Sequence, residues 1–331
     1  MSIYRREAVD AALYVLRDVN RNLLTTQRQV ATGLRVERAS DNGAYWAIST
    51  KLKTDQKAQS AIQDALGLAG ATMDTAYSAV AESTDLVSEI KAKLVAATET
   101  GVDKTKINDE LTQLKDQLRS VVSSATFNGD NWVQLKDGDN PAKPREIPAS
   151  FIRMADGTVR VDKLSYQVDI SPSGTTTSKD ARYLVDDRPD QSGQNGVFTS
   201  VHFATETGAS QNYVLVKTAG DSTGQVEIAL TENTSQDQVK EMVRVVDAML
   251  NQMTTVGSAF GALEKRISLQ SDFSKSINDN YSTSISRMID ANMEEEGSRL
   301  KALQTQQQLA LQSLSIANAA YDTVRQLFQN I

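Results

Sequence analysis

The distribution of proline most strongly constrains what this chain of 331 residues can fold into. All five prolines lie between Pro141 and Pro189, which leaves two proline-free arms, 1–126 and 236–331. Because proline inside a helix removes a hydrogen bond and clashes with the preceding turn, long helices are favoured in the arms and disfavoured in the middle. The sequence therefore predicts two helical arms around a middle section of different structure.

A heptad repeat of apolar residues runs through the first arm. Positions spaced alternately by four and three residues from Ile48 onward are apolar at twelve of fifteen sites. This spacing is typical of a left-handed coiled coil and predicts a helix over about 42–100, on the order of 90 Å long, with Ser40 or Asp41 as its N-cap. The seam positions are Ile48, Leu52, Asp55, Gln59, Ile62, Leu66, Ala69, Met73, Ala76, Val80, Ser83, Val87, Ile90, Leu94 and Ala97.

Four further seams have the same spacing. The short link Gly101–Asp103 predicts that the second seam folds back on the first as an antiparallel helical hairpin. Ser235 and Gln238 fit a capping box at the start of the C-terminal arm. The seams are Val9, Leu13, Leu16, Asn20, Leu23, Gln27, Val30 and Leu34; Ile107, Leu111, Leu114, Leu118, Val121 and Ala125; Val239, Val243, Val246, Leu250, Met253, Phe260, Leu263, Ile267, Ser274, Ile277, Tyr281, Ile285 and Met288; and Leu300, Leu303, Gln307, Ala310, Leu314, Ala317, Tyr321, Val324 and Phe328.

The last helix carries more apolar residues than one seam needs, because Leu309, Leu311, Ile316 and Leu327 lie off that seam. A helix that is apolar on several sides must be covered by other structure. The N-terminal helix of the same chain can cover one side only. Burial by neighbouring copies and an ordinary four-helix bundle core both remain open from periodicity alone.

The middle section, 127–235, is predicted to form a small β-rich insertion, so the fold class is mainly α with a β insertion. Residues 151–154 and 159–161 flank Asp156-Gly157 as a hairpin should. Alternation predicts four further strands over 166–170, 197–203, 213–216 and 226–230. In this interpretation His202 is a surface or half-buried strand residue.

Composition argues against several classes of function. The net charge of −7 lacks the basic footprint of a nucleic-acid binder, and no apolar run approaches the length that inserts in a membrane. The chain has no cysteine and one histidine, which excludes thiol catalysis and any site with two histidines or cysteine ligands. The charged N-terminal segment predicts no cleaved secretion signal. We therefore expect neither an enzyme nor a cofactor or metal site.

The start of the chain resembles the N-terminal signature of bacterial flagellins. Residues 31–48 read Ala-Thr-Gly-Leu-Arg-Val-Glu-Arg-Ala-Ser-Asp-Asn-Gly-Ala-Tyr-Trp-Ala-Ile, where the family commonly has S-S-G-L-R-I-N-S-A-x-D-D-A-A-x-x-A-I. The matches include Gly33, Leu34, Arg35, Asp41 and Ala44. Residues 40–46 and 89–98 look most like the rhizobial-type flagellins.

The end of the chain resembles the flagellin C-terminus without a gap. Matching positions are Arg266, Ser286, Arg287, Asp290, Glu296, Gln307, Gln308, Leu314, Ala317, Asn318, Val324 and Leu327. Together the two resemblances cover both arms, about 220 residues.

The resemblance implies a subunit that polymerises into the extracellular flagellar filament used for swimming. It implies an inner coiled-coil domain of 1–42 with 288–331, a helical rod domain of 43–136 with 233–287, and a solvent-exposed β-rich domain of 137–232. The implied partners are further copies, other flagellins, the flagellar export apparatus, which would pass the unfolded chain, the filament cap and the hook-junction proteins. A hook–filament junction protein and a non-flagellar coiled-coil surface protein are the alternatives.

Residues expected at the filament interface come from the terminal seams and from the matched signatures. They are Leu13, Leu16, Leu23, Gly33, Leu34, Arg35, Asp41, Ala44, Arg266, Arg287, Asp290, Leu300, Leu303, Leu314, Ala317, Asn318, Val324 and Phe328. Gly33 and the segment 36–44 are expected to connect the inner domain to the rod domain.

Overall fold

The computed structural model describes residues 2–139, 145–166, 183–188, 196–217 and 224–329, without the side chains of 2–8, 317–318 and 320–329. It divides into a terminal unit, Met1–Lys57 with Ile277–Ile331, and a central unit, Ala58–Ser276. The described elements are α1 (Ser2–Thr32), α2 (Gly43–Ala96), α3 (Lys104–Ser124), β1 (Thr126–Phe127), β2 (Asp130–Asn131), β3 (Gln134–Leu135), β4 (Arg145–Arg153), β5 (Val159–Tyr166), β6 (Val185–Asp186), α4 (His202–Glu206), β7 (Tyr213–Val214), β8 (Val226–Glu227), α5 (Gln236–Ile289) and α6 (Met293–Gln329). The expected long antiparallel helices of both arms are confirmed.

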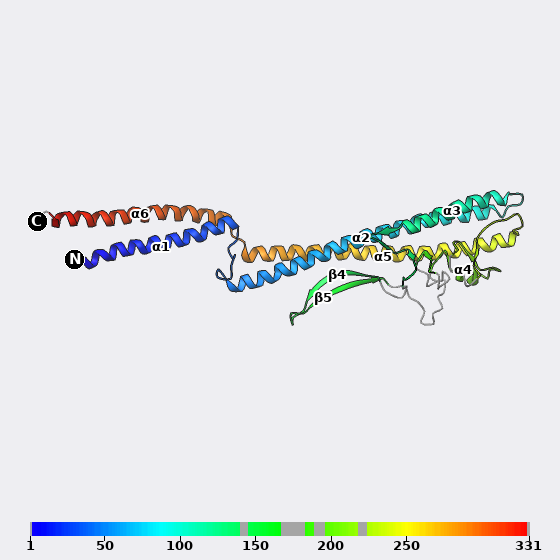
Figure 1. Cartoon of the computed structure of the whole chain (residues 1–331), viewed down its shortest axis with the longest axis horizontal. Coiled ribbons are helices and arrows are strands. Elements are labelled where there is room, and N and C mark those ends of the chain that lie inside the picture. Colours follow the sequence, from blue (N-terminus) through cyan, green and yellow to red (C-terminus); the bar gives the residue numbers. More distant parts are fainter. Residues whose placement is uncertain (1, 140–144, 167–182, 189–195, 218–223, 330–331) are drawn as a thin grey trace. The chain divides into compact units, whose positions relative to one another are not determined.

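In the terminal unit α1 and α6 lie side by side, with both chain ends at the same end of the pair (Figure 1). Their contact is built on Val19 and Leu23 of α1 and Leu303 of α6, with Leu300 packed against them. This small apolar core makes the pair a two-helix coiled coil with little burial of its own.

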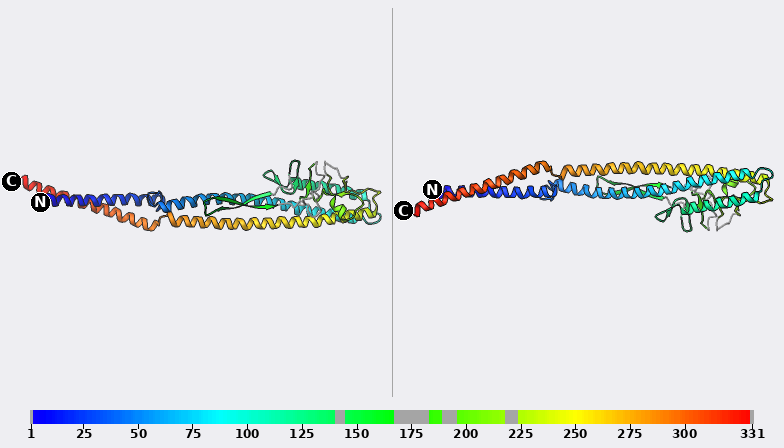
Figure 2. Two further views of the ribbon diagram at one scale, coloured as in Figure 1. Left: turned by 90° about the horizontal axis from the view of Figure 1, so that it is seen from below. Right: turned by 90° about the horizontal axis from the view of Figure 1, so that it is seen from above.

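In the central unit the side chains of the α2 heptad seam form a large part of the main core. Thirteen of the fifteen predicted seam positions are buried, among them Leu66, Met73 and Val87. The ten apolar residues among these thirteen form one hydrophobic cluster with seam residues of α3 and α5, including Leu118 and Met253. The prediction for Ile48 is wrong, because its side chain is 49% exposed at the start of α2. The views in Figure 2 show α5 running alongside α2.

The ends of the long helices are set by side-chain caps. The predicted capping box is confirmed: Ser235 N–H donates to Gln238 Oε1 at 2.9 Å, and Gln238 N–H donates to Ser235 Oγ at 3.2 Å. The predicted cap of α2 is wrong by one or two residues, since Asn42 Oδ1 accepts from Tyr45 N–H at 3.1 Å. Helix α2 also ends at Ala96, before the predicted residue 100.

The described part of the middle section contains four two-stranded sheets. The predicted hairpin is confirmed as β4 and β5, which pair antiparallel with Phe151 opposite Val161. Strands β3 and β6, and β7 and β8, pair in parallel. β7 and β8 are shorter than predicted, β5 ends at Tyr166, and residues 167–170 lie outside the described residues.

The predicted strand over 197–203 is wrong. His202 begins the short helix α4, where Ser200 Oγ accepts from His202 N–H at 3.2 Å and Thr205 N–H donates to the Val201 carbonyl at 3.1 Å. The Ser200 hydroxyl bonds to the local backbone and so offers it an alternative to a strand ladder, which the short alternation of residues 201–203 is too weak to outweigh.

The middle section shares its core with the helices. Phe198, Phe203 and Tyr213 are buried in the same cluster as Leu66 and Met249. None of the described helices has a stretch long and apolar enough to span a membrane.

Candidate assembly interface

The α1/α6 pair holds the first group of predicted interface residues. Leu23 and Leu303 are buried against each other's helix, and Leu300 packs beside them. Leu13, Leu16 and Leu314 are half-buried. Leu23, Leu300 and Leu303 therefore contribute to the contact between the two helices, while other faces of the pair stay open.

Those other faces carry several large apolar side chains. Leu309, Leu311 and Ile316 of α6 are 56%, 51% and 70% exposed. Tyr14 and Leu24 of α1 are 70% and 66% exposed. Large exposed apolar side chains gathered on one helical pair are typical of a protein interaction surface.

A second group of predicted residues forms the junction, which we define as residues 33–42 and 288–292. Helix α1 ends just before Gly33, whose φ of +70° lies in the left-handed region and whose N–H donates to the Gln29 carbonyl at 2.8 Å. Leu34 then forms an antiparallel bridge with Asp290, and Ala291 N–H donates to the Gly33 carbonyl at 2.9 Å. The connection between α1 and α2 and the connection between α5 and α6 are far apart in sequence, and backbone hydrogen bonds join them.

Arg35 fastens the junction to the end of α5. Its backbone N–H donates to the Ile289 carbonyl at 2.7 Å, and its guanidinium donates to the Met288 carbonyl at 3.0 Å. The carbonyl end of a helix attracts positive charge, so this contact is favourable in both charge and hydrogen bonding. The guanidinium also lies 6.0 Å from the ring centre of Tyr45.

Asp41 organises the loop that leads into α2. Its Oδ2 accepts from the N–H groups of Arg38 at 2.9 Å and Glu37 at 3.1 Å. Its Oδ1 accepts from the Arg28 guanidinium of α1 at 3.3 Å. The Arg38 N–H most of all, then the Glu37 N–H and the charge of Arg28, lower the pKa of Asp41 below its ordinary value of 3.8.

Loss of this carboxylate should loosen the junction loop. Because the pKa of Asp41 is lower in the folded chain, its stabilising contribution is present above pH 3.8 and is lost as the pH falls through the lowered pKa. We expect Asp41→Ala to speed hydrogen exchange of the Glu37 and Arg38 amides at pH 7, and to remove the acid-induced loss of protection shown by the unaltered chain. Asp18→Ala, which removes exposed side-chain contacts to Arg21 and Asn22 within α1, is the control. Unchanged protection in Asp41→Ala would contradict this role.

The other predicted interface residues lie outside the junction. Ala44 and Arg287 are exposed, at the start of α2 and in the last turn of α5. Arg266 is exposed too, but belongs to the central unit and is not part of the junction. The predicted interface side chains of Ala317, Asn318, Val324 and Phe328 lie outside the described residues.

The sequence reasoning missed two junction residues and one residue of α1 that contacts the junction. Asn42 and Asn292 cap α2 and α6, with Asn292 Oδ1 accepting from Glu294 N–H at 3.2 Å. Arg28 pairs with Asp41 from α1. An asparagine directly before a periodic stretch was an available cap signal, whereas nothing local pointed to Arg28.

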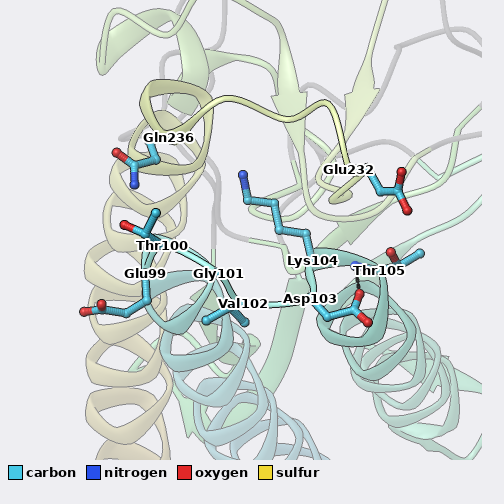
Figure 3. A pocket seen from close by; sticks show the side chains of 9 residues that line it. All are labelled: Glu99, Thr100, Gly101, Val102, Asp103, Lys104, Thr105, Glu232 and Gln236. Carbon is cyan, nitrogen blue, oxygen red and sulfur yellow. Dashed lines mark hydrogen bonds between the residues drawn. The ribbon is translucent and has the colours of Figure 1, made fainter.

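A pocket of about 490 Å³ lies at the turn between α2 and α3, in the central unit (Figure 3). Its polar groups serve the fold: Asp103 caps α3, Lys104 Nζ donates to the Thr234 carbonyl at 2.6 Å, and Gln236 Nε2 donates to the Thr98 carbonyl at 3.1 Å. Across the described residues no group of three or more acidic or histidine side chains is placed to hold a metal ion.

Comparison with known proteins decides the family. Residues 8–136 match the bacterial flagellin N-terminal helical region, and residues 243–328 match the bacterial flagellin C-terminal helical region. Flagellin C of Rhizobium meliloti (strain 1021) is 43% identical over 329 residues, covering 99% of each chain. The chain belongs to the bacterial flagellin family.

Other flagellins agree with this membership. Flagellin A of Rhizobium meliloti is 38% identical over 99% of this chain and 100% of its own length. Flagellin of Brucella melitensis biotype 1 is 32% identical over 99% of both chains. The similarity to rhizobial flagellins predicted from residues 40–46 and 89–98 is confirmed.

Membership in the flagellin family gives the chain its function. It is a structural subunit that polymerises with itself and with other flagellins into the extracellular helical filament of the bacterial flagellum, and its role in motility follows from the family. Its relatives are structural proteins rather than enzymes.

Proposed function

We propose that α1 and α6 form the inner layer of the filament and that their exposed apolar faces are the main contacts between subunits. The observation that carries this proposal is the exposure of Leu309, Leu311 and Ile316 on α6 and of Tyr14 and Leu24 on α1. Each α1/α6 pair buries one seam inside the subunit, and its exposed apolar side chains contact the neighbouring subunits. Folding of the α1/α6 pair is then coupled to association, because neighbouring subunits bury the apolar surface that the pair leaves exposed in the isolated subunit.

The junction has a separate part in this proposal. The backbone bridge between Leu34 and Asp290, the Arg35 contacts and the Asp41 hydrogen bonds connect the inner layer to the rod. Small rearrangements there would change how neighbouring rods meet, and would thereby alter filament curvature. Ala44, Arg266, Arg287 and the undescribed side chains of Ala317, Asn318, Val324 and Phe328 complete the proposed interface.

The proposed domains are an inner domain (1–42 with 288–331), a rod (43–136 with 233–287) and an outer β-rich domain (137–232). The two family matches support this arrangement because they cover 8–136 and 243–328 and leave the middle section unmatched. An unmatched middle suits a surface that is free to vary. The proposed partners beyond other flagellins are the export apparatus, the filament cap and the hook-junction proteins.

Single introduced thiols test the proposed burial, because the chain has no cysteine of its own. We expect Leu311→Cys to react with a maleimide in the monomer and to react at least about tenfold more slowly in filaments, since neighbouring subunits would cover it. Gln211→Cys, at an exposed position of the proposed outer domain, should stay reactive in both states. Equal reaction of Leu311→Cys in monomer and filament would count against the proposal.

A further inference from the structure

Each compact unit contains a polar pair between its N-terminal and C-terminal helices at a seam position. In the central unit Gln59 Nε2 of α2 donates to Ser274 Oγ of α5 at 2.7 Å, and both residues are buried. In the terminal unit Gln307 Nε2 of α6 donates to Asn20 Oδ1 of α1 at 2.7 Å. In both cases a polar interruption of one seam meets a polar interruption of the other.

The central pair is not explained by stability. Gln59 and Ser274 are 1% and 0% exposed, and Gln59 Oε1 is buried without a hydrogen-bond partner among the described residues. An apolar pair of similar volume would avoid the cost of removing these groups from water. A polar pair retained at a cost in stability is what coiled coils use to select one alignment of their helices.

The pairing of α2 with α5 requires that one alignment be selected over others. Along α2 and α5 apolar residues recur with a heptad spacing, so a shift of seven residues again places apolar side chains opposite each other at most positions. The two helices come from opposite arms, and no short loop between them dictates their alignment. In a shifted pairing, however, Gln59 and Ser274 would each face apolar side chains and lose their shared hydrogen bond.

We propose that the Gln59–Ser274 hydrogen bond is a register lock, which selects the alignment of α2 with α5 while the two arms pair. The Asn20–Gln307 contact has the matching geometry in the α1/α6 pair. This role concerns pairing within one subunit, so it does not depend on which faces the filament covers.

Disulfide trapping during refolding of the full chain tests the lock. Lys91 and Asp247 form an ion pair between α2 and α5, so Lys91→Cys with Asp247→Cys reports the native register. Lys91→Cys with Thr254→Cys, or with Lys240→Cys, reports a shift of one heptad in either direction. Introduced thiols are the only ones in the chain, which makes each cross-link unambiguous.

In the otherwise unaltered chain, we expect the native cross-link and almost no shifted one. Gln59→Leu with Ser274→Ala should raise the shifted cross-links on the order of tenfold, because the unmatched polar groups no longer penalise the shift. The swapped pair, Gln59→Ser with Ser274→Gln, restores a hydrogen bond and should return the cross-links to the native pattern. Ser83→Ala is the matched control, since Ser83 Oγ is also buried in the α2 seam but has no hydrogen-bond partner among the described residues.

The outcomes separate cleanly. Shifted cross-links in the apolar pair, but not in the swapped pair or in Ser83→Ala, support the lock. Shifted cross-links that stay as rare in the apolar pair as in the unaltered chain overturn it. Shifted cross-links in the swapped pair at the level of the apolar pair also overturn it, because side-chain volume rather than the hydrogen bond would then set the register.

Discussion

A chain lacking residues 1–42 and 288–331 is expected to stay soluble, helical and monomeric and to form no filaments. The main hydrophobic cluster lies in the central unit, in residues such as Leu66, Val87 and Met253, so the truncation leaves that core intact. What it removes is the α1/α6 pair with its exposed apolar faces. Without those faces the free energy that drives association is lost while the rod remains.

The truncated and full-length chains would be compared by circular dichroism, by light scattering under polymerising conditions and by electron microscopy. Removal of either end alone should have the same effect on polymerisation, since each terminal helix is half of the pair. Filaments formed by the doubly truncated chain would refute the role assigned to α1 and α6.

A single charge on the open face of α6 should also stop assembly. Ile316 is 70% exposed in the subunit, so Ile316→Glu leaves the packing of α1 on α6 nearly unchanged. In a filament the same carboxylate would be buried among apolar side chains without a partner, which costs several kcal/mol per subunit by order of magnitude. We expect the concentration needed for polymerisation to rise by about a hundredfold or more, because every 1.4 kcal/mol is a factor of ten.

The matched control for this substitution is Gln211→Glu, which places the same charge at an exposed position of the proposed outer domain. It should polymerise at close to the normal concentration. The critical concentration is read from sedimentation of filaments. Normal polymerisation of Ile316→Glu, or an equal defect in Gln211→Glu, would show that the apolar face is not the contact.

The long helices could be predicted from sequence because their signal is local and repeated. Leu66, Met73 and Val87 follow one spacing over many turns, and the capping box of Ser235 and Gln238 lies within four residues. Ile48 fails because the periodicity extends one step beyond the stretch that α5 and α3 cover. A periodic pattern predicts an apolar stripe on a helix, but it does not predict where the helices that cover this stripe end.

Other features depend on contacts that no local pattern contains. Asp41 and Asn42 are both good cap residues, and only the hydrogen bonds of Asp41 to Glu37 and Arg38 leave the cap to Asn42. The Asn20–Gln307 contact joins residues from opposite ends of the chain, so its register could not be read from either seam.

The junction was predictable in part. Gly33, Arg35 and Asp41 stand out through their resemblance to the flagellin signature, and all three prove to hold the junction together. The partner atoms did not stand out, because backbone carbonyls such as those of Met288 and Ile289 leave no trace in a sequence. Arg28 was missed because a charged residue on a helix usually faces solvent, so the sequence gives no sign of its contact with Asp41.

Helical reconstruction of assembled filaments from electron cryo-microscopy images tests the central claim most directly. The account predicts that α1 and α6 form the innermost layer, with Leu311 and Ile316 of each subunit covered by neighbouring copies. A reconstruction in which α1 and α6 lie on the outside, or in which Leu311 and Ile316 stay exposed along the filament, would contradict it.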